Sequence, residues 1–298
     1  MSYAIGIDIG GTNTRIALIN DKYAIEQRIQ FSTDNSNPDE TVSEIKKAVA
    51  TFDKEIIGIG VSCPGPLDLI NGVVLETPNL KGWWNYPIAK KLSEACGLPV
   101  YLENDANLAA LAEAVIGEGK NYRYVQFLTI STGLGSGQVI DKKIYVGAHG
   151  YAHEIANMIM WRNGPQQGSV IAGGIEAISS GTAITKRAND AGLQVKHAGE
   201  VNDLAKSGNV IALGIMDDAK EYLANAIAAI IAITDPEIVI LGGSVALKIQ
   251  DFTSDVNKLV QTKVHANLKN LIPVVNSTLN EDSGLLGAAC LAFEKAKQ

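Results

Sequence analysis

Two short glycine-rich runs in this chain could bind phosphate through backbone atoms. The first is DIGGTNT at residues 8–14, and the second is TISTGLGSG at residues 129–137. Each run lies between apolar segments, which predicts two strands joined by a tight turn. Glycine lets the backbone approach a bulky anion, and consecutive N–H groups form an anion-binding concavity. Either run alone could be an ordinary hairpin turn. A plain hairpin needs only one or two glycines, however, whereas each run combines glycines with further small and hydroxyl residues. We therefore interpret the pair as two phosphate-binding loops, named the first loop and the second loop.

Other phosphate and metal motifs do not fit the chain. The only Gly-Lys pair is at residues 119–120, and Ala114 stands where a P-loop requires glycine. Neither loop has the spacing G-x-G-x-x-G of a dinucleotide site. The run HEIAN at residues 153–157 approaches the zinc-protease motif H-E-x-x-H, but Asn157 occupies the place of the second histidine. These differences argue against a P-loop, a Rossmann site and a hydrolytic zinc site.

The composition indicates a globular enzyme of about two domains. The chain has 298 residues, of which 46% are hydrophobic and 19% charged, so a large core is available. Its net charge of -7 argues against a nucleic-acid partner, because such partners usually bind a basic surface.

Three features point to a cytoplasmic location. Met1 leads directly into a strand, without the pattern of a signal peptide. Cys63, Cys96 and Cys290 are few and scattered, which predicts reduced, buried thiols. The apolar run at residues 223–233 is shorter than the ~20 residues needed to span a bilayer, so it predicts a buried helix and no membrane partner.

Strands and helices alternate along the chain, as in an α/β protein. Strands are expected over residues 3–7, 15–19, 24–31, 56–62, 100–102, 124–128, 138–140, 238–241 and 273–276. Helices are expected over residues 39–52, 88–96, 106–116, 175–191, 210–234, 251–265 and 283–295. Gly117 and Gly119 end one helix just before the second loop, which indicates a domain boundary. Aligning Tyr3 with Tyr124 places the two hairpins in register and favours an internal duplication.

The order of these motifs resembles the ROK family of sugar kinases and sugar-responsive repressors, within the actin and hexokinase fold superfamily. The resemblance runs from residue 3 to about residue 293. Besides the two loops, it rests on CPG at 63–65 with Asp68, TPNL at 77–80, ENDAN at 103–107, Glu154-Ile155, Ser180-Gly181, LGG at 241–243 and GLLGAA at 284–289.

The resemblance implies a two-lobed α/β fold made of duplicated ribonuclease H-like domains, with ATP and sugar in the cleft between the lobes. The N-terminal lobe would cover residues 1–118, and the C-terminal helix at 284–298 could complete it. The C-terminal lobe would cover residues 119–283 and carry the nucleotide site.

The resemblance also implies an ATP site with Mg²⁺. The residues expected to bind the nucleotide are Gly10, Gly11, Thr12, Thr132, Gly133, Gly135, Gly242 and Gly243. Asp8 would lie near Mg²⁺ and contact it through water.

The resemblance implies that Asp105 is the catalytic base, and its place where a strand gives way to a helix would let its side chain point into the cleft. A carboxylate within hydrogen-bond reach can take the proton of a sugar hydroxyl as the bond to phosphorus forms. The alternative is that Asp105 is only a helix N-cap, a position that favours Asp. Asn104 would bind sugar hydroxyls, and its alternative is a turn residue.

Glu154 and Glu176 match two family glutamates that bind the sugar ring. A carboxylate suits this role because it can accept hydrogen bonds from adjacent hydroxyls. The alternative for Glu176 is a first-turn helix residue that interacts with the helix dipole. Gly65 and Asn79 would line the same pocket.

The chain departs from the family at the usual zinc module, a histidine and three cysteines. The corresponding positions hold Asn157, Gln167, Ser169 and Gly174, which predicts a protein without zinc. The family histidine also touches the sugar, so Asn157 becomes a candidate sugar contact and the identity of the sugar stays open.

We therefore expect an ATP-dependent kinase acting on a primary hydroxyl, at carbon 6 of a hexose or a β-glucoside. The shorter side chain of Asn157 could leave room for a substituent on the anomeric oxygen. One competing class is the repressor, but repressors carry a DNA-binding domain before the first loop, which here starts within ten residues of Met1. A second is an actin-like structural protein, and the retained ENDAN run and Glu154 argue against it. Relatives in the family are commonly dimers, so a homodimer is an expected assembly.

Overall fold

The computed structural model describes residues 1–77 and 79–297 of the chain, with Asn280 described by its backbone alone. The chain forms two compact units. The first unit contains Met1–Ile116, Gly147–Gly150 and the described residues from Glu281 onward, and the second contains Gly117–Val146 and Tyr151–Asn280. The short segment Gly147–Gly150 falls within the first unit, which no sequence pattern indicated.

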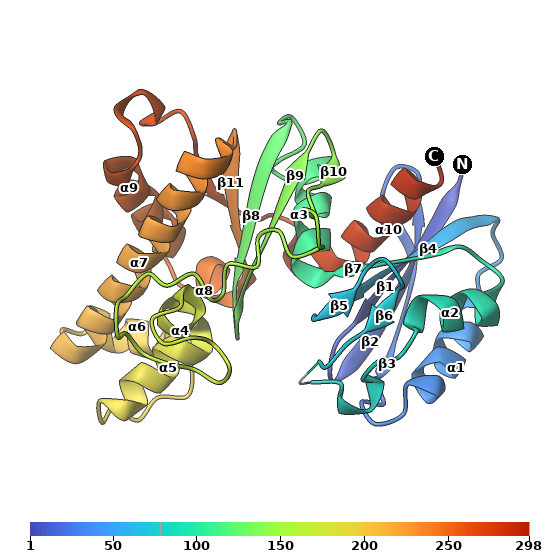
Figure 1. Ribbon diagram of the computed structural model, residues 1–298, viewed down its shortest axis with the longest axis horizontal. Coiled ribbons are helices and arrows are strands. Elements are labelled where there is room, and N and C mark those ends of the chain that lie inside the picture. Colours follow the sequence, from blue (N-terminus) through green and yellow to red (C-terminus); the bar gives the residue numbers. More distant parts are fainter. Residues whose placement is uncertain (78, 298) are drawn as a thin grey trace. The chain divides into compact units, whose positions relative to one another are not determined.

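The first unit is built on a five-stranded sheet with the order β3-β2-β1-β4-β7 (Figure 1). Its strands are β1 (Tyr3–Ile9), β2 (Asn13–Asn20), β3 (Ile25–Ser32), β4 (Ile56–Cys63) and β7 (Val100–Asn104). β1 pairs antiparallel with β2, and β2 antiparallel with β3. β4 runs parallel to both β1 and β7, so these three strands end at one edge of the sheet.

The second unit repeats this arrangement with the order β10-β9-β8-β11-β12. Its strands are β8 (Tyr124–Ile130), β9 (Leu134–Ile140), β10 (Lys143–Ile144), β11 (Ile238–Gly242) and β12 (Val274–Asn276). The pairing senses are also the same, antiparallel for β10-β9 and β9-β8 and parallel for β8-β11 and β11-β12. The shared order and senses confirm the duplication that the two hairpins predicted.

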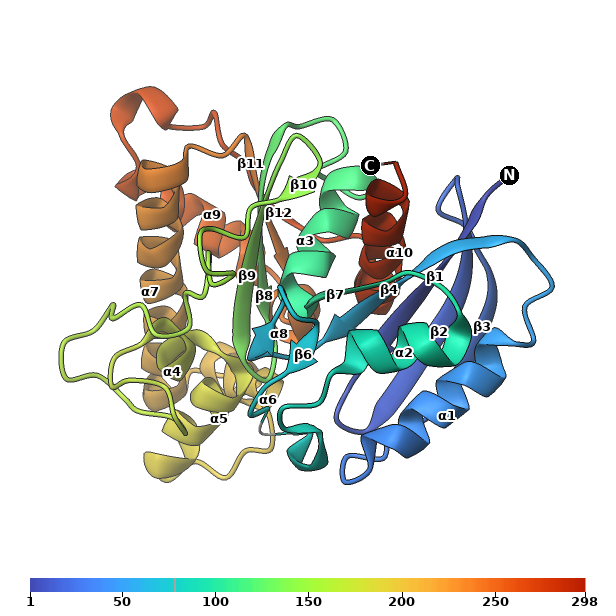
Figure 2. The ribbon, with the colours of Figure 1, turned by 45° about the vertical axis from the view of Figure 1, so that its right-hand side comes forward.

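Helices cover both faces of the first sheet, as Figure 2 shows. They are α1 (Pro38–Val49), α2 (Ile88–Cys96), α3 (Asp105–Val115) and α10 (Ser283–Lys295). Alternate residues of β1 point to opposite faces: Ile5 and Ile7 pack in the core with α1 and α2, whereas Gly6 faces α10. α10 therefore packs directly on the sheet.

The second unit has six helices among its described residues, and they bury a core rich in Ile, Val and Ala. They are α4 (Ile175–Ser179), α5 (Gly181–Asp190), α6 (Ala198–Lys206), α7 (Val210–Thr234), α8 (Gly243–Lys248) and α9 (Phe252–Lys263). The single helix expected over residues 175–191 is wrong, because the extended backbone of Ser180 (ψ 158) divides it. The Ser180 hydroxyl then caps α5 by accepting the N–H of Ala183. α6 and α8 were not expected from the sequence.

The remaining regular elements are short. They are β5 (Leu67–Asp68), β6 (Val73–Val74) and the 3-10 turns Lys81–Trp83, Ala266–Leu268 and Asn280–Asp282.

Two expectations about burial need correction. Within residues 223–233, Leu223 and Ile227 are fully buried, but Ile233 is 81% exposed because it lies near the end of α7. Cys63 and Cys290 are buried, whereas Cys96, the last residue of α2, is only partly buried. None of the described helices is long and apolar enough to cross a membrane.

Candidate functional site

The first loop is a tight turn closed by its own backbone. The N–H of Gly10 donates to the carbonyl of Asn13 at 2.9 Å, and Thr12 is exposed. Asn79 lies directly against this turn, since a Cβ on Gly11 would come 3.0 Å from the Asn79 Cβ. Asn79 therefore contacts the first loop, a contact that no sequence pattern indicated. Pro78, which precedes it in the TPNL motif, lies outside the described residues.

The carboxyl ends of β1, β4 and β7 bring the acidic candidates to one edge of the first sheet. Asp8 is in register with Ser62, and Cys63 is in register with Asn104. The pKa of the Cys63 thiol is raised, mainly by burial and further by the negative charges of Asp105 and Asp8. Both carboxylates therefore lie near this thiol, at the edge where parallel sheets commonly bind ligands.

Asp8 is paired with a cation of its own unit. The Nε of Arg15 donates to Oδ2 of Asp8 at 3.2 Å, and Nη2 of Arg15 bonds the same oxygen. Oδ1 packs closely against Gly284, since a Cβ there would be only 3.0 Å away, so glycine at this position makes room for the carboxylate. A carboxylate is a chemically suitable ligand for Mg²⁺, which is typically held by one or two carboxylates, substrate phosphates and water.

Asn104, and not Asp105, occupies the N-cap of α3. Its Oδ1 accepts the N–H of Ala106 at 2.9 Å, and its backbone is extended (ψ 146). Asp105 is the first residue of the helix, and Oδ1 of its exposed carboxylate also accepts the N–H of Ala106, at 2.8 Å. Gly65 lies beside the cap, since a Cβ there would be 3.3 Å from Nδ2 of Asn104.

Glu103 stabilises the turn between β7 and α3, a role that no sequence pattern indicated. It is only 5% exposed, and its Oε1 accepts the N–H of Asn104 at 2.9 Å and Nδ2 of Asn107 at 3.0 Å. Burial raises the pKa of the Glu103 carboxyl, against the lowering effect of these two bonds. No helical spacing could have indicated this bond, because Glu103 lies in β7 and Asn107 in α3.

The second loop is held by the starts of α5 and α8. The carbonyl of Ser131 accepts the N–H of Gly181 at 2.7 Å, and the hydroxyls of Ser131 and Ser244 lie 3.2 Å apart. Gly243 has a φ of +84, and a Cβ there would be 2.4 Å from the carbonyl oxygen of Ile130. The turn at Gly242 and Gly243 therefore packs against the end of β8, next to the second loop.

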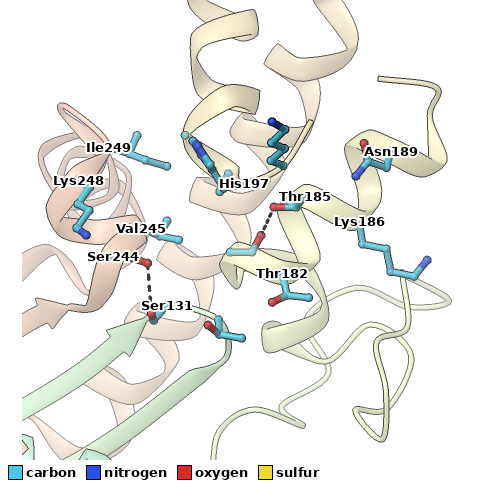
Figure 3. A pocket seen from close by; sticks show the side chains of 15 residues that line it. Ser131, Thr182, Thr185, Lys186, Asn189, His197, Ser244, Val245, Lys248 and Ile249 are labelled. Carbon is cyan, nitrogen blue, oxygen red and sulfur yellow. Dashed lines mark hydrogen bonds between the residues drawn. The ribbon is translucent and has the colours of Figure 1, made fainter. Parts of the chain in front are cut away.

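A cavity of about 860 Å³ opens beside this loop, entirely within the second unit. Figure 3 shows Ser244 and Lys248 of α8 on one side and Thr182 and Thr185 of α5 on the other. The wall also includes Thr132, Lys186, Lys196 and His197. This volume suits a small-molecule ligand, and hydroxyl and ammonium donors suit one that carries phosphate. The basic residues were missed because α5, α6 and α8 meet only in the tertiary structure.

The other glycines predicted in the second loop have different surroundings. Gly135 lies in β9, in register with Thr129 of β8. Gly133 lies against Glu176, since a Cβ there would be 2.7 Å from Oε2 of that carboxylate.

Glu176 and Glu154 lie near one another in the second unit. Glu176 is in the first turn of α4, and its Oε2 accepts the N–H of Leu134 at 2.7 Å. Glu154 remains accessible to solvent. Its carboxyl pKa is raised, first by partial desolvation and second by the negative charge of Glu176.

Asn157 is exposed, but its side-chain oxygen is already engaged. Oδ1 accepts the N–H of Ile171 at 2.8 Å and so ties down the segment that contains Gln167, Ser169 and Gly174. Backbone bonds add to this, including one from Gly174 to the carbonyl of Ile171 at 2.8 Å. Across residues 1–77 and 79–297, no group of three or more His, Cys, Asp or Glu side chains is arranged to hold a metal ion.

Comparison with known proteins agrees with the fold and the motifs. The ROK family model matches residues 4–295. The chain is 31% identical to a glucokinase of Thermotoga maritima, covering 98% of this chain and 97% of that protein. It is also 31% identical to an N-acetylmannosamine kinase of Salmonella typhi, covering 97% of each.

Solved structures give the same result. The ROK hexokinase of Thermus thermophilus matches with a TM-score of 0.92 and 29% identity over 99% of both chains, which confirms the predicted hexokinase-type fold. A ROK glucokinase of Streptomyces griseus in complex with glucose and AMPPNP matches with a TM-score of 0.78 and 26% identity, over 98% of this chain and 99% of that one. This chain belongs to the ROK family.

Proposed function

We propose that this protein, an ATP-dependent sugar kinase, transfers the γ-phosphoryl group to the primary hydroxyl at carbon 6 of a hexose or a β-glucoside. The observation that carries the proposal is the exposed carboxylate of Asp105. The Asn104 cap and the buried Glu103 fix the turn that carries it, at the same sheet edge as Asp8. The relatives named glucokinase and N-acetylmannosamine kinase support an activity on sugars.

Asp105 acts as the general base in this proposal. Its carboxylate accepts the proton of the attacking hydroxyl while the new oxygen–phosphorus bond forms and the bond to ADP breaks. Asn104, Gly65 and Asn79 lie close to the same turn or to the first loop, so they are suited to orient the sugar. Phosphoryl transfer depends mostly on such positioning and on stabilising negative charge.

The nucleotide occupies the cavity beside the second loop. Backbone N–H groups of the loop face the phosphates, with Thr132, Ser244 and Lys248 as further donors. Gly10, Gly11 and Thr12 bind phosphate through the first loop, and Gly242 and Gly243 shape the turn before Ser244. Mg²⁺, held by the phosphates and through water by Asp8, would neutralise phosphate charge.

Glu154 and Glu176 bind ring hydroxyls of the sugar. Asn157 contributes less than the sequence suggested, because its oxygen is bonded to the N–H of Ile171. The proposal leaves two classes of acceptor to be compared. A free hexose would use another contact at the anomeric end, whereas a β-glucoside would fill the space beside the short Asn157 side chain.

Kinetics on a panel of acceptors tests the proposal. We would measure kcat/KM with MgATP for glucose, fructose, N-acetylmannosamine and a β-glucoside under identical conditions, and identify the phosphorylated carbon of each product by NMR. Turnover with phosphate on carbon 6 is the expected result. Failure to phosphorylate any acceptor would overturn the proposal, and rejection of every glycoside would leave a plain hexokinase.

A further inference from the structure

The carboxylate of Glu176 makes an unusually close contact with two successive residues of the second loop. Its Oε2 accepts the N–H of Leu134 at 2.7 Å. The same oxygen would lie 2.7 Å from a Cβ on Gly133, closer than real Cβ atoms approach oxygen. The absent side chain of Gly133 therefore lets the carboxylate reach the amide of the next residue.

This contact holds the loop where it enters β9, which begins at Leu134. The other end of the loop is held by two different contacts. The N–H of Gly181 donates to the carbonyl of Ser131, and the hydroxyl of Ser131 lies within hydrogen-bond distance of the hydroxyl of Ser244. The part of the loop that faces the cavity lies between these two attachments, because Ser131 and Thr132 line the cavity. Within the loop, the N–H of Ser131 also donates to the carbonyl of Gly133 at 2.9 Å, so losing the Glu176 contact would release mainly the side of the loop at Gly133 and Leu134.

Glu176 also acts electrostatically on the second proposed sugar ligand. Its negative charge contributes to the raised pKa of Glu154, so the two carboxylates are close enough to interact. Glu176 thus contacts the second loop through Oε2, and it is also one of the two glutamates proposed to bind the sugar.

We propose that Glu176 is a positioning residue for ATP as well as a sugar ligand. Oε2 fixes the second loop in its phosphate-binding geometry, while Oε1 accepts a hydrogen bond from a sugar hydroxyl. Sugar and nucleotide affinity are therefore coupled through a single side chain. This inference rests on the function proposed above, because it assumes that the cavity binds ATP and that Glu176 binds sugar.

Direct titration of MgATP without sugar separates the two roles of Glu176. Glu176→Ala is expected to raise the Kd for MgATP about tenfold, the usual effect of losing a charge-assisted hydrogen bond. Glu176→Gln keeps an oxygen that can accept the Leu134 N–H, so its Kd should stay within about threefold of the parent. Glu154→Ala is the matched control, because it removes a neighbouring carboxylate and should raise the KM for sugar without changing the Kd for MgATP.

A double-mutant cycle with Gly133→Ala tests the contact itself. In the parent protein the added methyl group meets Oε2 of Glu176 and should raise the Kd for MgATP. In a Glu176→Ala background the obstacle is gone, so the same substitution should have little further effect. If Glu176→Ala does not fold, Glu176→Asp replaces it in the cycle, because its shortened side chain cannot reach Leu134.

The outcomes separate the two proposals. An unchanged Kd in the Glu176→Ala or Glu176→Asp protein, or equal effects of Gly133→Ala in both backgrounds, would overturn the positioning role alone. A parent protein that neither binds MgATP nor phosphorylates sugar would instead overturn the proposed function.

Discussion

The buried carboxylate of Glu103 accepts the backbone N–H of Asn104 at 2.9 Å, and Asn104 directly precedes Asp105, the proposed base. Burial raises the pKa of Glu103 above the usual 4.5, so the folded protein holds this proton more tightly than the unfolded chain. The contribution of Glu103 to stability therefore falls as the pH rises from 4.5 through the raised pKa.

Glu103→Gln should remove this pH dependence while keeping an oxygen for the Asn104 N–H. We expect the Tm of the variant to fall less steeply than that of the parent as the pH is raised from 4 to about 8. Thermal unfolding by circular dichroism at a series of pH values measures the difference between the two proteins. Identical slopes would show that Glu103 does not titrate differently in the folded state.

Asp105→Asn should retain the fold and MgATP binding but lose turnover. The amide keeps the shape of the side chain and an oxygen for the Ala106 N–H, yet it cannot take the hydroxyl proton, so kcat should fall at least ~10²-fold. Asp39→Asn is a matched control, because Asp39 also lies in the first turn of a helix of the first unit. Near-normal turnover by Asp105→Asn would leave Asp105 with a structural role only.

Gly60→Ala should destabilise the first unit severely. A Cβ on Gly60 would lie 1.8 Å from the carbonyl oxygen of Ala288, so α10 would have to move away from the sheet. We expect a loss of about 3 kcal/mol or more in the free energy of unfolding. Gly58→Ala in the same strand is the control, since its Cβ would meet the Pro99 oxygen at an ordinary 3.4 Å. Chemical denaturation of both variants makes the comparison, and equal stabilities would contradict the close packing of α10.

The fold was largely predictable because its signals are local. Alternating apolar runs and glycine turns indicated the two hairpins, and the helical period indicated α7 and α10. The break at Ser180 was not predictable, because the apolar pattern continues through it. The division there accompanies a bond from Gly181 to Ser131, a partner distant in sequence.

The sequence supplied candidate residues for the site but could not show their contacts. Motif resemblance pointed to Asp105 and Glu176, but it could not show that Asn104 is the N-cap or that Glu176 bonds Leu134. The same limit applies to Lys196, just before α6, and Lys248 of α8, which line the cavity only because segments distant in sequence meet there.

Chelation should separate a catalytic need for metal from a structural one. Treatment with EDTA is expected to stop turnover by removing Mg²⁺ and to leave the Tm unchanged, because the segment around Ile171 is tied by Asn157 and backbone bonds. Added Mg²⁺ should restore turnover fully. Stoichiometric zinc in the untagged protein by elemental analysis, or unfolding on chelation, would contradict the prediction of a zinc-free protein.

Sugar affinity should weaken in mildly acidic solution because of Glu154. Its pKa is raised above the usual 4.5, so it becomes protonated at a higher pH than an ordinary glutamate as the pH falls. The neutral carboxyl group accepts weaker hydrogen bonds than the charged one, so the KM for sugar should rise through the raised pKa. Glu154→Gln, which cannot titrate, should have a higher KM at neutral pH and little dependence on pH between 4.5 and 7. Steady-state kinetics of parent and variant at saturating MgATP measure both curves. A parent protein whose KM for sugar is constant over this range would show that the charge of Glu154 does not contribute to sugar binding.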